Sequence, residues 1–546
     1  MGTHKKGKGM GIQTYTRAAG TRKTPQHSPI PGRTDMVLNA AGGYVFEVDK
    51  WGRLDRFLIL GSEGGTYYTD ERSLTLDNTG AVRACLAEDG KRTVDVIVDV
   101  SDKGRAPKND PAIFALGLAL KTGDEATRKY AQENISKVVR IGTHLFQLAE
   151  VVESLGGWGR GTRATFARWY AEKGKESLAY QLVKYRQRNG WTHRDVLRLA
   201  HPTPNALLGW AAGKATVDDV PIIEGFEKAQ KAGSAKESAA LIREYKLPRE
   251  AILTEHLSDV AVQDALLVDM PVHAMVRNLG NMTKSGLLVP GSDATRRVIT
   301  YLEDVARLRK ARLHPMAVLI AQRTYARGQG LRGSGTWAPV PKIIDALDEA
   351  FYACFANVEP TNRKIVIGID TSGSMGAGWG NGMSSGLTTY EAATAMALVT
   401  LATEPNSMAM GFDSHAHDLA LSGKQRLNDA LEYMRNQFRG GMTDCSVPYK
   451  WAAVRFPGAE DFITITDNES WAGDIHPTQA LVDWRRFSKG DPQAKAVVMA
   501  MTATRNSIAD PHDAGQLNVV GFDATVPAII GDFISGATAH VASNDR

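Results

Sequence analysis

The stretch KIVIGIDTSGS, residues 364–374, decides the fold of the C-terminal part of this chain. A β-branched apolar run ends there in an aspartate and a tight turn, which is the pattern of a buried parallel strand. Further strand-like runs begin near residues 407, 461, 495 and 517, and helical segments separate them. Alternating strands and helices predict a doubly wound α/β sheet over residues 361–546.

Oxygen-bearing side chains gather at the predicted carboxyl edge of this sheet, where such folds bind their ligands. The five candidates are Asp370, Ser372, Ser374, Thr443 and Asp467. Carboxylate and hydroxyl oxygens suit a hard divalent cation, so the pattern predicts a site for Mg²⁺ or Mn²⁺. The alternative is an ordinary strand-to-helix turn made of common residues.

The chain before this domain has a different periodicity. Residues 44–60, between two glycine pairs, alternate as in a short hairpin, and helical spacing then continues to about residue 357. Single helices are expected at roughly 126–153, 175–188 and 248–256. Short linkers between many helices predict an α-solenoid over residues 36–360, although no repeat of fixed period is visible.

Charge is distributed unevenly along the chain. Residues 361–546 carry 14 Lys+Arg and 20 Asp+Glu, so the remainder carries 51 and 40. Residues 1–35 are basic, contain no acid before Asp35 and have few large apolar side chains, which predicts a disordered tail. A basic N-terminal part attracts phosphate backbones, although the excess is mild for its length.

Composition excludes several classes of protein. The three cysteines are far apart, which argues against a disulfide scaffold and a cysteine-ligated zinc site and favours a reducing cytoplasm. No apolar run approaches the length of a membrane span, and no apolar core follows the basic N-terminus as in a secretory signal.

Basic and aromatic residues alternate within residues 184–203, and basic helical faces precede this stretch. Guanidinium groups suit phosphates, and aromatic rings stack on unpaired bases, so the pattern favours RNA binding. The alternative is a solvated helix face over core aromatics. The candidate RNA contacts are Lys137, Arg140, Arg160, Arg163, Lys184, Arg186, Arg188, His193, Arg194 and Arg198.

From residue 36 to the C-terminus the chain resembles the Ro ribonucleoprotein autoantigen family, whose helical part is the TROVE module. The resemblance rests on long ordered motifs. They include Asn39-AAGGYVFEV, Lys184-YRQRNGWTHRDVLRLAHP, Arg277-NLGNMTKSGLLVPG, Asp370-TSGSM, Gly440-GMTDCSVP and Thr466-DNESWAGDIHP.

The resemblance implies a ring of HEAT-like helical repeats closed by a von Willebrand factor A-like domain with a metal-ion-dependent adhesion site. Ser372, Ser374 and Thr443 would ligate the metal directly, while Asp370 and Asp467 would act largely through water. His193 would be the principal residue of the outer RNA-binding surface.

The same resemblance implies binding of Y RNA and of single-stranded 3′ ends of misfolded RNAs, and possible tethering of a 3′–5′ exoribonuclease. We expect a cytoplasmic monomer without catalytic activity, since no nucleophile–base pair or bridging carboxylate pair is apparent. A metal-dependent protein adaptor without an RNA ligand is the competing hypothesis. The glycine-rich segment 376–386 would be a lineage-specific insertion beside the metal.

Overall fold

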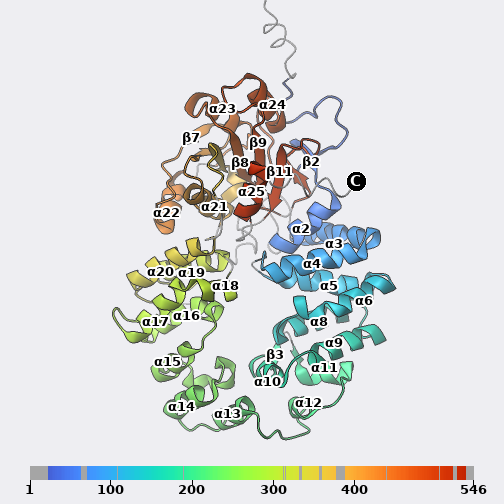
Figure 1. Ribbon diagram of the computed structural model, residues 1–546, viewed down its shortest axis with the longest axis vertical. Helices are drawn as coiled ribbons and strands as arrows, with labels where there is room; N and C mark the ends of the chain where they lie inside the picture. The colour runs from blue at the N-terminus through green and yellow to red at the C-terminus, as the bar shows by residue number, and fades with distance from the viewer. Residues whose placement is uncertain are drawn as a thin grey trace, which may run out of the picture.

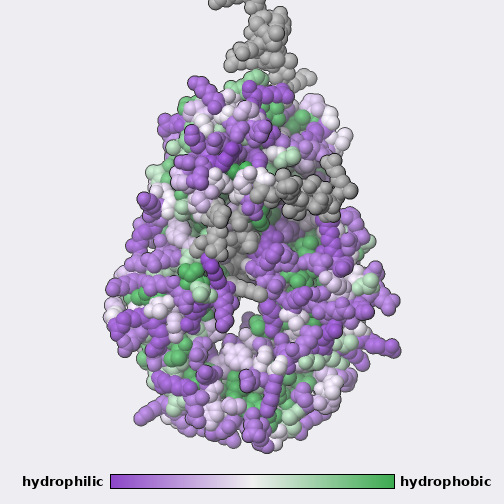
Figure 2. Space-filling model, viewed as in Figure 1, coloured by the Kyte–Doolittle hydropathy of each residue, from purple (hydrophilic) through white to green (hydrophobic). Residues whose placement is uncertain are grey.

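The computed structural model describes residues 23–62, 71–106, 108–188, 190–311, 313, 315–330, 335–355, 360–376, 388–437, 440–502, 504–520 and 526–536. Within them, helices follow one another around an arc that starts and ends at a sheet domain (Figure 1). Figure 2 shows a narrow opening between the two sides of this arc. The predicted architecture, a helical-repeat ring followed by an α/β domain, is confirmed.

The arc consists of short helices that pack on their neighbours in the sequence, such as α5 on α6 and α8. Its first half contains α2 (Lys50–Leu60), α3 (Glu71–Glu88), α4 (Gly90–Lys103), α5 (Asp110–Thr122), α6 (Glu125–Glu133), α7 (Ile135–Val138), α8 (Gly142–Ser154), α9 (Arg160–Ala171), α10 (Lys175–Lys184), α11 (His193–Ala200) and α12 (Ala206–Ala211). Its second half contains α13 (Pro221–Ala229), α14 (Ala235–Tyr245), α15 (Val260–Val268), α16 (Val272–Lys284), α17 (Asp293–Glu303), α18 (Val305–Lys310), α19 (Pro315–Arg327) and α20 (Pro341–Ala353).

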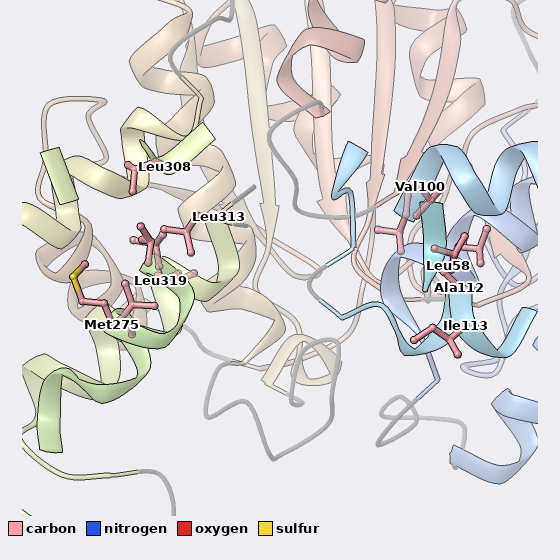
Figure 3. Close-up of a cluster of buried hydrophobic side chains, with 14 of the residues drawn as sticks. Leu58, Val100, Ala112, Ile113, Met275, Leu308, Leu313 and Leu319 are labelled. Atoms are coloured by element: carbon pink, nitrogen blue, oxygen red, sulfur yellow. The ribbon is translucent and has the colours of Figure 1, made fainter. Parts of the chain in front are cut away.

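Buried apolar side chains hold the arc together at both of its ends. Figure 3 labels Leu58, Val100, Ala112 and Ile113 near the start of the arc and Met275, Leu308, Leu313 and Leu319 near its end. These residues belong to one continuous core that extends onto one face of the sheet. Burial of apolar surface is therefore shared between the arc and the sheet domain.

The sheet has the order β11 (Gln516–Val520), β9 (Lys495–Ala500), β8 (Asp461–Thr466), β5 (Ile365–Asp370), β6 (Met408–Phe412) and β7 (Ala416–Asp418). All neighbours are parallel except β6 and β7. Alternate residues of one strand enter different cores: Ile367 packs on the arc side, and Val366 packs on the other side.

Helices cover both faces of this sheet, as a doubly wound fold requires (Figure 1). The side facing the arc carries α21 (Thr389–Thr403), α22 (Leu427–Gln437) and α25 (Val526–Ser535). The opposite side carries α23 (Val447–Arg455) and α24 (Pro477–Phe487). The sequence pattern identifies all of these helices except α23, which is only nine residues long and has no clear apolar stripe.

The first hairpin differs from the sequence expectation. The structure pairs β1 (Met36–Leu38) with β2 (Tyr44–Glu47), while residues 50–60 form α2. Asp49 accepts a hydrogen bond from the Gly52 amide at 2.8 Å and so caps that helix. The alternating residues 44–47 are thus the second strand of the hairpin and not its beginning.

Three helix predictions are also wrong in their extent. The expected helix 126–153 is divided into α6, α7 and α8. The helix expected over 175–188 ends at Lys184 and is followed by β3 (Gln187–Arg188), which pairs with β4 (Trp191–Thr192). Residues 248–256 form two short 3-10 turns, η1 (Arg249–Ala251) and η2 (Thr254–His256).

The predicted disordered tail is wrong for residues 23–35, whereas residues 1–22 lie outside the described residues. Thr24 and Gln26 are buried against the sheet domain. The Thr24 amide donates to the Gln479 side chain at 3.1 Å, and Arg33 forms an ion pair with Asp510. The glycine-rich segment 376–386 lies outside the described residues except for Gly376.

Candidate functional site

The five predicted metal-site residues lie together at the carboxyl edge of the sheet. Asp370 ends β5, and Ser372 and Ser374 follow in the turn that leads into the 3-10 helix η3 (Gly373–Gly376). Asp467 follows β8, which pairs with β5 in parallel. Thr443 lies in the loop before α23, and all five residues are buried. The topology therefore assembles the constellation that the sequence predicts.

The geometry of this cluster leaves one buried hydroxyl, that of Thr443, without a hydrogen-bonding partner among the described residues. The hydroxyls of Ser372 and Ser374 lie 3.3 Å apart. Asp370 accepts from the Ser372 amide at 2.9 Å and from the Thr466 hydroxyl at 2.6 Å. The Thr443 hydroxyl is buried and has no hydrogen-bond partner among the described atoms. A buried hydroxyl of this kind is costly unless a ligand or ion satisfies it.

Electrostatics supports the same interpretation. Burial, and then the charge of Asp467, raises the pKa of Asp370 to about 7. Burial also raises the pKa of Asp467, although a hydrogen bond from Ser374 opposes that change. Two buried carboxylates that repel one another become stable as anions when a cation lies between them. The residues present fit a hard divalent cation.

Sequence reasoning missed two residues of this site, Thr466 and Glu469. Thr466 orients Asp370 through its hydroxyl, and the Glu469 amide donates to Asp467 at 3.0 Å. Burial, and then the charge of Asp467, raises the pKa of Glu469 to about 7. Thr466 and Glu469 lie within two positions of Asp467 in the sequence, and this closeness is the only sequence feature that links them to the site. The described part of the chain has no group of three or more His, Cys, Asp or Glu side chains placed to hold a metal, since the candidate site offers two carboxylates and three hydroxyls.

Most of the predicted RNA contacts lie on the surface of the arc. Arg160 and Arg163 are exposed on α9, and Arg194 and Arg198 are exposed on α11, which packs against α9. The other exposed candidates are Lys137, Arg186 and Arg188, and Lys184 is half-buried. None of the six arginines at 160, 163, 186, 188, 194 and 198 forms an ion pair with another described residue. Their charges remain available for an external anion.

The structure buries His193 beneath the outer surface, where it lines the cavity of about 730 Å³ that adjoins the basic residues, and a direct RNA contact through it stays a prediction. The residue is 3% exposed, and its Nδ1 lies 2.8 Å from the Tyr170 hydroxyl. The ring packs among Phe146, Trp169 and Tyr170. Burial lowers the pKa of His193 to about 4, so the imidazole is neutral at pH 7. The side chain supports α11 from within the core.

Arg140 also has a different position from the one expected. Its guanidinium donates to the Ser101 carbonyl at 3.1 Å, to the Ser101 hydroxyl at 2.8 Å and to the Lys137 carbonyl at 2.7 Å. The side chain therefore connects α4 to the end of α7. Its cation is largely occupied within the protein.

A groove beside the basic surface was not predicted. Three cavities of about 730, 580 and 440 Å³ all have Arg249 in their lining. Lys184 and Glu250 line the two larger cavities. The remaining cationic and aromatic lining residues are Tyr180, Arg186, His193, Arg194, Trp210, Phe226, Tyr245, Lys246 and Lys284. Because these residues come from separate helices, no local pattern in the sequence identifies the groove.

Cations and rings are already paired within this groove. The Arg186 guanidinium lies 4.8 Å from the centre of the Phe226 ring, and the Lys184 ammonium lies 5.3 Å from that of Tyr180. Arg249 donates to the Asn278 side chain at 3.1 Å. A cation held over an aromatic face keeps its charge and offers a flat surface beside it. Such an arrangement can accept the phosphates and bases of an unpaired strand.

Comparison with known proteins agrees with both domains. The TROVE domain matches residues 37–237 and 243–324, and the Ro60 vWA domain matches residues 364–534. RNA-binding protein RO60 of Deinococcus radiodurans is 40% identical over 96% of this chain and 100% of that protein. RNA-binding protein RO60 of Caenorhabditis elegans is 32% identical over 92% of this chain and 90% of that protein.

A solved structure agrees with the same assignment. The crystal structure of the Deinococcus radiodurans RO (RSR) protein superposes with a TM-score of 0.67 and 38% identity, covering 89% of this chain and 100% of that one. Among the described residues, no helix has the length and apolar character that crossing a bilayer requires. With a TROVE domain followed by a Ro60 vWA domain, this chain belongs to the Ro60 family.

Proposed function

We propose that this chain binds non-coding RNA and acts as a scaffold in RNA quality control or processing. The main observation behind this proposal is the set of exposed arginines on α9, on α11 and between α10 and α11, none of which forms an ion pair with a described carboxylate. Two of these arginines, Arg186 and Arg194, line the cavity of about 730 Å³ that also contains Arg249, Trp210 and Phe226. Unpaired cations attract the phosphate backbone, and the groove provides stacking surfaces for unpaired bases. The relatives whose names include RNA binding support the same conclusion.

The RNA ligands that fit this proposal are Y RNA-like molecules on the outer basic surface and single-stranded 3′ ends. The scaffold would act as a monomer without catalysis of its own and could hold a 3′–5′ exoribonuclease near its RNA. All three cysteines are free thiols, which fits a cytoplasmic location. A metal-dependent protein adaptor without an RNA ligand leaves the unpaired arginine surface unexplained.

We also propose that Asp370, Ser372, Ser374, Thr443 and Asp467 hold Mg²⁺ or Mn²⁺. The unpartnered Thr443 hydroxyl and the two neighbouring serine hydroxyls support this assignment. A cation bound mainly by neutral hydroxyls keeps net positive charge and would attract an acidic group. This role is separate from RNA binding by the arc.

The proposed RNA surface is tested by the salt dependence of binding. The ligand is a hairpin RNA with a single-stranded 3′ tail, and the variant is Arg186→Gln/Arg194→Gln/Arg198→Gln. If each guanidinium contacts one phosphate, the slope of log K against log salt falls by about 2, since each single-strand contact contributes about 0.7. Affinity should fall most at low salt, where counterion release is largest.

The control must remove the same charge from cations that are already paired. Lys228→Gln/Arg243→Gln/Arg296→Gln meets this condition, because these cations pair with Glu224, Asp264 and Asp293. We expect this variant to keep the slope of the unmodified protein. Equal losses in the two triple variants would mean that net charge alone governs binding, and the absence of binding at low salt would refute the RNA proposal.

A further inference from the structure

The hairpin formed by β1 and β2 contacts the loop that carries Asp467. Asn39 donates through its side-chain amide to the Ser470 carbonyl at 2.8 Å. The Ala41 amide donates to the Glu469 carboxylate at 3.2 Å. Asn39 also accepts from the Gly43 amide at 2.8 Å and so fixes the turn of the hairpin itself. The turn and the loop are thus joined by hydrogen bonds between residues more than 400 positions apart.

Gly43 permits this contact because it has no side chain. A Cβ atom at this position would lie 2.0 Å from the Ser470 carbonyl oxygen and 2.7 Å from the Trp471 Cα. Both neighbours are backbone atoms, which cannot move aside as a flexible side chain can. Any substitution of Gly43 must therefore displace the loop or the hairpin.

The contacted loop in turn holds two residues of the candidate metal site. The Ser470 hydroxyl donates to the Thr443 carbonyl at 3.3 Å, and the Trp471 amide donates to the same carbonyl at 3.1 Å. The Glu469 amide donates to the Asp467 carboxylate at 3.0 Å. The hairpin turn is therefore connected to Thr443 through Ser470 and to Asp467 through Glu469.

We propose that the hairpin turn, residues 39–43, positions Thr443 and Asp467 and thereby sets the affinity of the site for a divalent cation. The turn precedes the helical arc in the sequence, and its strand β2 pairs with β10 (Asn506–Ser507) of the sheet domain that contains the site. This role rests on the metal site proposed above. It also explains the motif Asn39-AAGGYVFEV, which has no part in the RNA surface.

The experiment measures Mn²⁺ binding to the full-length protein by electron paramagnetic resonance of the free ion. Gly43→Ala should weaken the affinity by about 10- to 100-fold, as is usual when the groups that orient metal ligands are disturbed. Asn39→Ala removes only the bond to Ser470 and the turn contacts, so a smaller loss in the same direction is expected. Ala40→Ser is the matched control, because this exposed side chain lies in the same turn.

The outcomes separate the two proposals. If the unmodified protein does not bind Mn²⁺, or if Asp370→Asn binds it equally well, the metal site itself is wrong. If the unmodified protein binds Mn²⁺ and Asp370→Asn does not, while Asn39→Ala and Gly43→Ala retain full affinity, the positioning role is overturned. If Gly43→Ala does not fold, as circular dichroism would show, the result with Asn39→Ala decides the question alone.

Discussion

We predict that Arg56 holds the start of the helical arc against the sheet domain, and its replacement by methionine tests this role. Arg56 lies on α2 and is fully buried. Its guanidinium donates to the Thr504 carbonyl, to the Asn506 carbonyl at 2.6 Å and to the Asn518 side chain at 2.8 Å. All three acceptors belong to the sheet domain, so this one side chain joins the two domains.

The loss of stability expected for Arg56→Met follows from the buried acceptor atoms that the substitution leaves without a donor. Each buried acceptor that loses its donor costs about 1–3 kcal/mol, and the Thr504 and Asn506 residues are too buried for water to replace the guanidinium easily. Removing the buried cation offsets part of this loss, because the folded state no longer has to desolvate a charged guanidinium. We therefore expect a net loss of about 3 kcal/mol in the free energy of unfolding.

The assay combines urea unfolding with hydrogen exchange of β11, because a two-domain chain need not unfold in one step. The matched control is Arg53→Met, one turn earlier on the same helix. Arg53 pairs with Asp77 inside the arc, and its loss should cost no more than about 1 kcal/mol. Exchange in β11 should accelerate only in Arg56→Met. Unchanged exchange there, or an equal loss of stability in both variants, would refute the role of Arg56 in closure.

Three further predictions concern other parts of the ring. Burial lowers the pKa of His193 and of His144 to about 4, so the free energy of unfolding should be highest above about pH 6.5 and should fall by about 3 kcal/mol for each residue as the pH approaches 4. Thermal unfolding of His193→Gln, measured against pH, should show a shallower loss of stability than the unmodified protein. Arg323→Met should cost about 3–5 kcal/mol because it leaves Glu391 buried without its cation, and Arg323→Met/Glu391→Gln should recover part of this loss in the same unfolding assay. Mg²⁺ at a hundred times its Kd should stabilise the protein by about 2.7 kcal/mol, and a thermal shift that persists in Asp370→Asn would contradict the assigned site.

Several features could be predicted from local sequence alone. The five parallel strands are short, mostly apolar runs, as expected for strands that are buried on both faces of a sheet. Asp370 ends one of these strands and Asp467 follows another, so the candidate metal site follows from the rule that ligands lie at the carboxyl ends of parallel strands. The helical arc was predicted by its periodicity and by the family resemblance.

Local sequence could not distinguish an exposed basic residue from a buried one within the stretch 184–203. His193 and Arg194 are adjacent in the sequence, yet the first is buried among aromatic rings and the second faces solvent. Helical periodicity allows either residue to be the inward one until the neighbouring helices are placed. For the same reason, the cavities around Arg249 have no signature in any single segment.

The two domain types, their order and the residues of the candidate metal site could all be read from patterns local to the sequence. How the N-terminal hairpin and the start of the arc attach to the sheet domain is visible only in the folded chain, where Arg56 contacts Asn506 and Asn39 contacts Ser470. Both pairs join residues more than 400 positions apart, and each consists of ordinary polar groups that many other residues could provide. Such contacts are selected by shape and burial once the whole chain has folded, so no local pattern specifies them.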